Sequence, residues 1–175
     1  HKEYRRQRQM CIRDRDYMDN RVNEETVADG RRLAQQHKRL LDVIEQRFGV
    51  SRYIVLAIWS MESSYGKALE KPGSLKHVPQ ALATLAYLDE RRAGFARQQL
   101  IGALKIVQAG HVSPKGLTGS WAGAMGHTQF IPTSYLAYAV DMDGDGHPNI
   151  WTSVPDALGT AANLLSKNGW RTGRT

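Results

Sequence analysis

One glutamate follows an apolar run, and its position suggests proton-transfer chemistry. The run begins at Tyr53, contains Trp59 and leads to Glu62 in the stretch AIWSMESSYG. A carboxyl group at the end of a buried helix loses hydration, which raises its pKa and keeps it protonated near neutral pH. We therefore interpret Glu62 as a candidate general acid. The alternative is a glutamate that points outward and is satisfied by water or by a cation such as Lys67.

A second group of carboxylates has the spacing of a calcium site. In DMDGDGHPNIW, Asp141, Asp143 and Asp145 occupy alternate positions, and a glycine stands in sixth place. Oxygens at the first, third and fifth positions of an EF-hand loop bind the ion, and the glycine permits the turn. His147 would contribute its carbonyl group, whereas Thr152 replaces the usual glutamate of the twelfth position. Three close carboxylates repel one another without a cation, so we expect bound calcium.

Other chemical signatures are missing from the sequence. The six histidines have no metal-ligand spacing, and there is no nucleophile elbow, phosphate-binding loop or dinucleotide fingerprint. We interpret His127 as a surface or packing residue rather than a second base. The single cysteine, Cys11, excludes an internal disulfide framework and a cysteine zinc cluster.

The elements that position these residues are expected to be helices. We expect them from Asn23 to Gly49, after Ser51, from Pro79 through Leu88, around a stripe of Phe95, Leu100, Leu104 and Val107, in TSYLAYAV, and from Ser153 to Gly169. The segment after Ser51 is apolar on every side, which is typical of a helix buried in the centre of a domain. Because period-two patterns are scarce, we predict a mainly α domain.

Residues 1–16 differ from the rest of the chain of 175 residues. They hold six Lys/Arg and three Asp/Glu without an apolar period, and RQMCIRDR resembles translated sequencing-adapter text. We interpret residues 1–16 as a non-native or disordered arm and residues 17–175 as one domain. The arm carries three of the seven net positive charges, so a nucleic-acid-binding function loses most of its support. Neither a signal peptide nor an apolar run of roughly 18 residues is present.

Five blocks of the chain resemble the lytic murein transglycosylase B family, in the same order. They are AIWSMESSYG, ALATLAYL, GSWAGAMGHTQFIPTSY, DMDGDGHPNIW and AANLLSKNGW. The resemblance implies a lysozyme-like, mainly helical catalytic domain with an EF-hand-like calcium loop. It also implies cleavage of the bond between N-acetylmuramic acid and N-acetylglucosamine in peptidoglycan, without water, to leave a 1,6-anhydro ring.

The resemblance implies roles for individual residues. Glu62 matches the catalytic acid/base, and Ser120 and Gln129 match polar residues of the substrate cleft. Tyr17 falls where members place a sugar-stacking aromatic side chain. Asp156 would close the calcium loop, although it can also form a capping box with the serine three residues earlier.

The glycine-rich loop GSWAGAMG fits a polymer cleft. Its glycines allow the backbone to approach a bulky glycan, and Trp121 and Tyr135 can offer ring faces to sugars. The alternative is that the large side chains of the loop are core residues. We expect that alternative for Met125 and Phe130 and leave Trp121 open.

The implied reaction requires one carboxylate. Glu62 would protonate the leaving oxygen and then take the proton from the muramyl 6-hydroxyl group. A usual glycosidase needs a second carboxylate about 5 to 9.5 Å away, for which Glu70, Asp89 and Glu90 are candidates. Lysozyme-type hydrolysis is therefore one alternative, and a catalytically silent peptidoglycan-binding domain is another.

The resemblance also implies partners and location. Peptidoglycan glycan strands are the expected partner of a monomer in the periplasm or cell envelope, calcium has a stabilising role, and catalysis needs no cofactor. Membrane association would require an N-terminal anchor that this chain lacks. Leu164 stands where members often carry an aromatic residue, and the chain stops after NGWRTG, so we expect a truncated C-terminus.

Overall fold

A computed structural model describes residue 19 and residues 21–173 of the chain. Its elements are α2 (Glu24–Gln36), α3 (Lys38–Phe48), α4 (Arg52–Ser63), the 3-10 helix η1 (Lys67–Leu69), β1 (Lys76–His77), α5 (Val78–Leu88), α6 (Ala93–Gln108), β2 (Thr118–Gly119), α7 (Pro132–Tyr138) and α8 (Val154–Lys167). The prediction of a mainly α chain is confirmed. Residues 1–16 and Tyr17 lie outside the described residues, so the predictions made for them stay predictions. None of the described helices combines the length and hydropathy that a membrane span requires.

Two compact units divide the chain, one up to Lys38 and one from Arg39 onward. In the first unit, Asn23 caps α2 as predicted, because its Oδ1 accepts the N–H of Thr26 at 2.9 Å. The prediction of one continuous helix from Asn23 to Gly49 is wrong. The helix ends at His37, whose φ of −100° and ψ of 19° depart from helical values. Neither proline nor glycine marks this break in the sequence.

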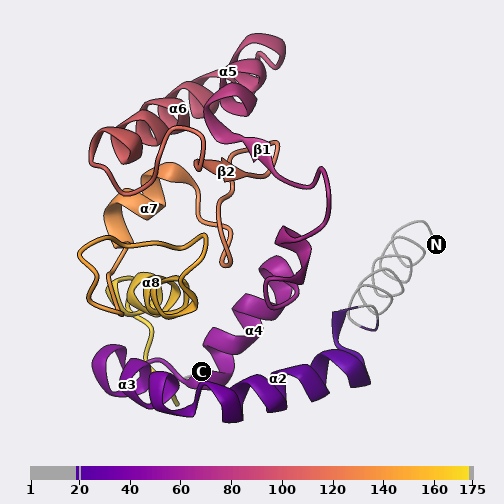
Figure 1. Ribbon diagram of the computed structural model, residues 1–175, viewed down its shortest axis with the longest axis vertical. Coiled ribbons are helices and arrows are strands. Elements are labelled where there is room, and N and C mark those ends of the chain that lie inside the picture. Colours follow the sequence, from indigo (N-terminus) through magenta and orange to yellow (C-terminus); the bar gives the residue numbers. More distant parts are fainter. Residues whose placement is uncertain (1–18, 20, 174–175) are drawn as a thin grey trace, which may run out of the picture. The chain divides into compact units, whose positions relative to one another are not determined.

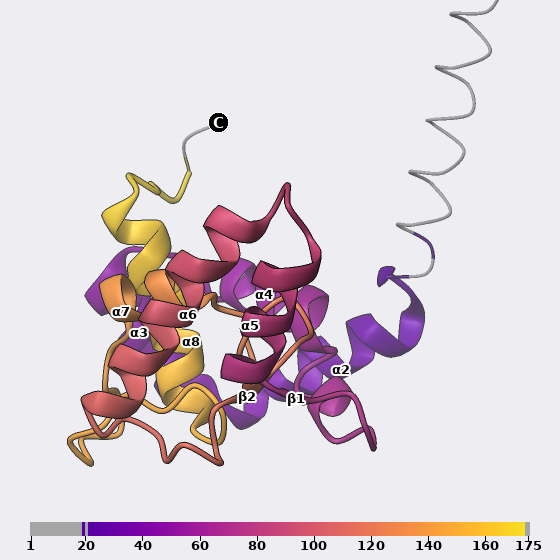
Figure 2. The ribbon, with the colours of Figure 1, turned by 90° about the horizontal axis from the view of Figure 1, so that it is seen from above.

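The second unit is an assembly of packed helices (Figure 1). α5 packs against α6 as an adjacent pair, which Figure 2 shows from above. α7 contacts both α6 and α8, and α4 contacts α8. The antiparallel strands β1 and β2 pair Lys76 with Gly119 and join the segment before α5 to the glycine-rich loop.

One apolar core holds this unit together. Its members are Val78, Leu82, Ala103, Ile106, Leu117, Met125, Phe130, Tyr135, Ile150, Ala157 and Ala161. Met125 and Phe130 are core residues as predicted. The interpretation of Tyr135 as a sugar-stacking residue is wrong, because its ring is fully buried and its hydroxyl donates to the carbonyl of Pro148 at 2.5 Å. Burial raises the pKa of this hydroxyl group.

Two helices bury different faces from those predicted. α4 is not buried all round: Val55 and Trp59 face the interior, whereas Tyr53 is 72% exposed. The buried residues of α6 are Ala96, Gln99, Gly102, Ala103 and Ile106. The predicted stripe is wrong in part, because Leu104 is 54% exposed. The buried face of α6 is formed mostly by small residues, because α6 approaches α7 closely. A Cβ at Gly102 would lie 3.1 Å from the Cβ of Pro132.

Three predicted helix starts are confirmed. The Oγ of Ser51 accepts the N–H of Tyr53 at 3.4 Å, and the Oγ of Ser153 accepts the N–H of Asp156 at 3.3 Å. Pro79 stands in the first turn of α5, where a missing N–H costs no helical hydrogen bond. The two serines therefore mark where α4 and α8 begin, and both helices contribute residues to the pocket described below.

Gly126→Ala is expected to destabilise the chain far more than Gly110→Ala. Both glycines have positive φ, of 67° and 76°. A Cβ at Gly126 would lie 2.3 Å from the carbonyl oxygen of Ile150, whereas Gly110 has open space around it. The shared backbone strain costs roughly 1–2 kcal/mol and the clash roughly a further 1–3 kcal/mol. Urea unfolding of both variants measures the difference, and equal losses would contradict the prediction.

Candidate active site

Glu62 and Gln129 line the same pocket, whose volume is about 290 Å³. The lining residues are Ile58, Glu62, Thr128, Gln129, Phe130, Ile131, Ser134, Ala161 and Leu164. Glu62 lies in the last turn of α4 and its side chain is exposed, so the prediction that the helix buries it is wrong. Ile58 was missed in the sequence, although it lies one turn before Glu62 on the same helical face.

Glu62 is the only carboxylate among the described residues that line this pocket. Glu70 lines a separate pocket of about 300 Å³, beside His127. Asp89 lines a third pocket of about 490 Å³, and Glu90 lines none of the three. The polar groups that accompany Glu62 are hydroxyl and amide groups, which donate or accept hydrogen bonds without competing for the proton.

Left-handed backbone occurs in the turn that follows α4 and at Gln129, which lines the pocket. Within the described chain, the non-glycine residues with positive φ are Ser64 at 51°, Tyr65 at 58° and Gln129 at 50°. Conformations of this kind cost of order 1–3 kcal/mol each and persist only where their surroundings hold them. The ring of Tyr65 packs edge-on against Trp59, with centroids 5.6 Å apart. The Nε2 of Gln129 donates to the carbonyl of Gly126 at 2.9 Å.

His127 joins the end of α4 to the loop that contains Gln129. The indole Nε1 of Trp59 donates to Nδ1 of His127 at 3.1 Å, so His127 is neutral and carries its proton on Nε2. The Oγ of Ser63 donates to the carbonyl of His127 at 2.6 Å. A Cβ at Gly66 would lie 2.7 Å from the His127 ring, so glycine is required there. The interpretation of His127 as a packing residue is confirmed.

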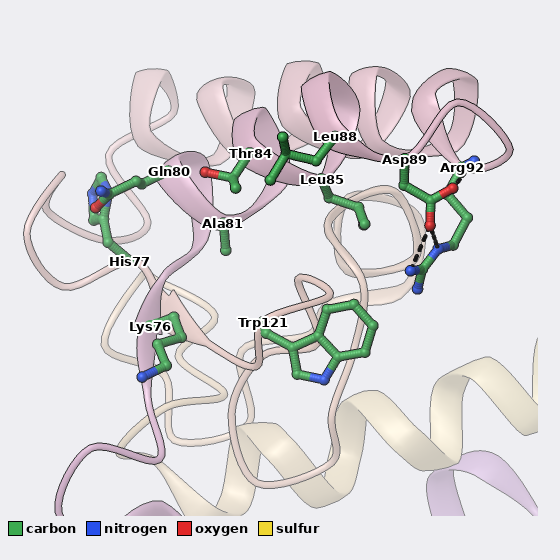
Figure 3. A pocket seen from close by; sticks show the side chains of 10 residues that line it. All are labelled: Lys76, His77, Gln80, Ala81, Thr84, Leu85, Leu88, Asp89, Arg92 and Trp121. Atoms are coloured by element: carbon green, nitrogen blue, oxygen red, sulfur yellow. Dashed lines mark hydrogen bonds and ion pairs between the residues drawn. The ribbon is translucent and has the colours of Figure 1, made fainter.

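Ser120 and Trp121 are not among the residues that line the pocket of Glu62. The Oγ of Ser120 accepts two main-chain N–H groups of its own turn, at 3.3 and 3.0 Å. Trp121 is 58% exposed and lines the 490 Å³ pocket that Figure 3 shows. The guanidinium group of Arg92 lies 5.0 Å from the Trp121 ring, and its Nε donates to Asp89 at 2.6 Å. Trp121 is therefore a surface residue and not a core residue.

The acidic loop brings three carboxylates together. Oxygens of Asp141, Asp143 and Asp145 lie within 4.8 Å of one another. The two oxygens of Asp141 accept the N–H groups of Gly144 at 2.6 Å and Gly146 at 2.8 Å. These hydrogen bonds stabilise the charged form and lower the pKa of Asp141. The loop therefore holds Asp141 ionised, as a cation ligand must be.

Asp156 fastens the same loop to α8. It is fully buried, and its two oxygens accept the N–H groups of Met142 and Asn149, both at 2.7 Å. The N–H of Ser153 donates to the carbonyl of Asn149 at 3.1 Å instead of to Asp156, so the capping box is only half formed. The hydroxyl of Ser153 donates to Asp143 at 2.6 Å, which ties the helix start to the acidic cluster.

A family profile described as the transglycosylase SLT domain matches residues 1–175 of the chain. The chain is also 36% identical over 154 residues to the membrane-bound lytic murein transglycosylase B of Escherichia coli K12. That match covers 88% of this chain and 41% of the relative. The chain therefore spans about two fifths of the length of this curated relative.

Solved structures of similar proteins have the same fold. SltB3 from Pseudomonas aeruginosa, in complex with NAG-NAM-pentapeptide, matches with a TM-score of 0.84 and 46% identity over 91% of this chain and 41% of its own. The Escherichia coli lytic transglycosylase Slt35, in complex with calcium, matches with a TM-score of 0.81 and 34% identity. That match covers 91% of this chain and 50% of Slt35.

Acidification is expected to weaken the fold through His127. Burial lowers the pKa of His127 below its ordinary value of 6.5, so the unfolded chain binds this proton more readily than the folded chain. The contribution of neutral His127 to the free energy of unfolding is complete above about pH 6.5 and is lost as the pH falls through the lowered pKa. Urea unfolding at about pH 7.5 and about pH 5 measures the loss. His127→Asn keeps an acceptor for Trp59 but does not titrate, and it should lose less; equal losses would contradict this prediction.

Proposed function

Because this chain belongs to the transglycosylase SLT domain family, we propose that it cleaves peptidoglycan glycan strands by lytic transglycosylation. The observation that carries the proposal is the pocket that Glu62 and Gln129 share, in which Glu62 is the one carboxylate among the described lining residues. The relative SltB3 was solved with NAG-NAM-pentapeptide, which supports the same substrate class here.

In the proposed reaction Glu62 acts first as an acid and then as a base. Its carboxyl group gives a proton to the glycosidic oxygen, and the bond from that oxygen to the muramyl C1 breaks. The muramyl 6-hydroxyl oxygen then bonds to C1, and the ionised Glu62 takes the hydroxyl proton. The product is a 1,6-anhydro ring, no water is consumed, and Glu62 returns to its starting protonation state.

Because Glu62 is exposed, the bound substrate itself would have to shield it from water. A carboxyl group is a more effective general acid near neutral pH when it is shielded from water, because desolvation raises its pKa. Since α4 does not bury Glu62, a sugar ring seated in the pocket would have to cover it. The apolar side chains of Ile58 and Leu164 line the same pocket and would exclude water from the other side.

We assign substrate contacts to four residues. Gln129 would bind the sugar next to the reacting bond, since it shares the pocket with Glu62. Ser120 and Trp121 would bind a neighbouring part of the strand, with the exposed Trp121 ring as a stacking face. Tyr17 lies outside the described residues and is assigned from the family resemblance alone.

We also propose a structural calcium ion in an EF-hand-like loop. Asp141, Asp143 and Asp145 would supply carboxylate oxygens, and His147 its carbonyl group. Asp156 does not belong to this cluster of three carboxylates and is assigned to the site from the family resemblance, while its oxygens accept the N–H groups of Met142 and Asn149. The calcium complex of Slt35 supports the choice of ion. Catalysis itself would need no cofactor.

The partner and location follow from the substrate. The chain would act as a monomer on glycan strands of the cell envelope or periplasm, where murein lies. We further propose that residues 1–16 are not part of the functional domain. The rival proposal is a silent peptidoglycan-binding domain of the same fold, which would retain affinity for the polymer without releasing fragments.

Glu62→Gln is expected to abolish the release of fragments from purified peptidoglycan. Mass spectrometry should show wild-type muropeptides one water lighter than hydrolysis products. Glu70→Gln is the matched control, because Glu70 lines a different pocket, and it should keep nearly full activity. Full-mass reducing ends would indicate hydrolysis, and binding without any release would favour the silent domain.

Calcium is expected to raise the melting temperature of the chain. An ion that binds only the folded state adds about 2.7 kcal/mol at a hundredfold excess over its Kd. Asp145→Asn should reduce the rise in melting temperature that calcium causes. Glu90→Gln should leave that rise unchanged, because Glu90 is an exposed residue outside the acidic loop. A melting temperature that calcium does not change would rule out this site.

A further inference from the structure

We propose that Ser63 and His127 are positioning residues that hold Glu62 in register with Gln129. This inference rests on the proposed function and deepens it, because it explains how one carboxylate is kept in place for two proton transfers. The element concerned is a clamp formed by the hydroxyl of Ser63, the backbone and ring of His127, the indole of Trp59 and the N–H of Gly66.

The clamp acts on the residue directly after Glu62. The Ser63 side chain is only 1% exposed, so water does not replace its hydrogen bonds. Its hydroxyl donates to the carbonyl of His127 at 2.6 Å and accepts the N–H of Gly66 at 3.0 Å. The other available acceptor, the carbonyl of Trp59, lies farther away at 3.4 Å. The hydroxyl therefore bonds the loop rather than its own helix.

The last turn of a helix needs such support. Carbonyl groups there lack helical partners, and the turn frays easily. Beyond Glu62 the backbone passes through two left-handed residues, Ser64 and Tyr65, before Gly66 with φ of 90°. Without an external tie, the free energy gained by relaxing these residues would favour movement of the turn that carries Glu62.

The other half of the clamp fixes the loop. The His127 ring accepts the indole N–H of Trp59 at 3.1 Å and fills the space beside Gly66, while its main-chain N–H donates to Ile150 at 3.0 Å. Gln129 follows two residues later and lines the pocket. Because both sides of His127 are held, these contacts join the pocket wall that carries Glu62 to the wall that carries Gln129.

Two substitutions that introduce side chains of nearly equal shape distinguish the effect of the Ser63 hydroxyl group from the effect of packing. Ser63→Thr and Ser63→Val add similar volume and differ in the hydroxyl alone. One hydrogen bond of this kind corresponds to about a tenfold effect. We expect kcat of the valine variant to be about tenfold below that of the threonine variant, with KM within about twofold. Both are measured at a temperature at which circular dichroism shows folded protein.

The outcomes are distinct. Equal kcat values for the two variants would overturn the proposal, as would a loss in KM alone. If neither variant folds, Ser63→Ala against the wild type gives the same comparison without added atoms. If the wild type itself releases no fragments, the proposed function fails; amide exchange of Gly66 then tests the clamp, with about tenfold faster exchange expected in Ser63→Ala and equal exchange overturning it.

Discussion

Close backbone packing of the loop from residue 119 to residue 130 is the constraint on which the rest of the site depends. Met125 pairs with Gly119 on one side and with Phe130 on the other. A Cβ at Gly119 would lie 2.3 Å from the carbonyl oxygen of Ala124, so even a methyl group is excluded there. The fully buried Met125 side chain anchors this folded-back loop in the core. Because the backbone of this loop is held in place, Gln129 can keep its strained left-handed conformation, with a φ of 50°.

Polar contacts extend this rigidity to the C-terminal half of the chain. His127 donates its N–H to the carbonyl of Ile150, which follows the acidic loop. Asp156 ties that loop to α8, and Thr128 donates its hydroxyl to the carbonyl of Ala157 at 3.3 Å. The acidic loop and the pocket are therefore attached to the same turn of α8. If the acidic loop binds the proposed calcium ion, this attachment would let the ion influence the pocket through the stability of α8.

The sequence predicted features that depend on local chemistry. Caps at Asn23, Ser51 and Ser153 were found because one side chain next to an apolar pattern determines each of them. The exposure of Glu62 was not predicted, because it depends on which elements cover α4 and not on the composition of α4. The face that α6 buries also depends on a partner, since Gly102 faces Pro132 only after α7 is in place. The contact between Trp59 and His127 joins residues far apart in sequence, and no local pattern records it.

The exposure of Glu62 is consistent with its proposed role on a polymer substrate. An enzyme that buried Glu62 permanently would shift its protonation but would also block the approach of a bulky strand. In the proposed reaction Glu62 gives and then takes a proton within one turnover, so it needs a fixed position more than a fixed environment, because the leaving oxygen and the attacking 6-hydroxyl oxygen both react at the same muramyl C1. The clamp at Ser63 provides the position, and the strand itself can provide the environment. The proposed reaction therefore requires both features: a rigid loop keeps the pocket in position, and an open pocket admits the glycan strand.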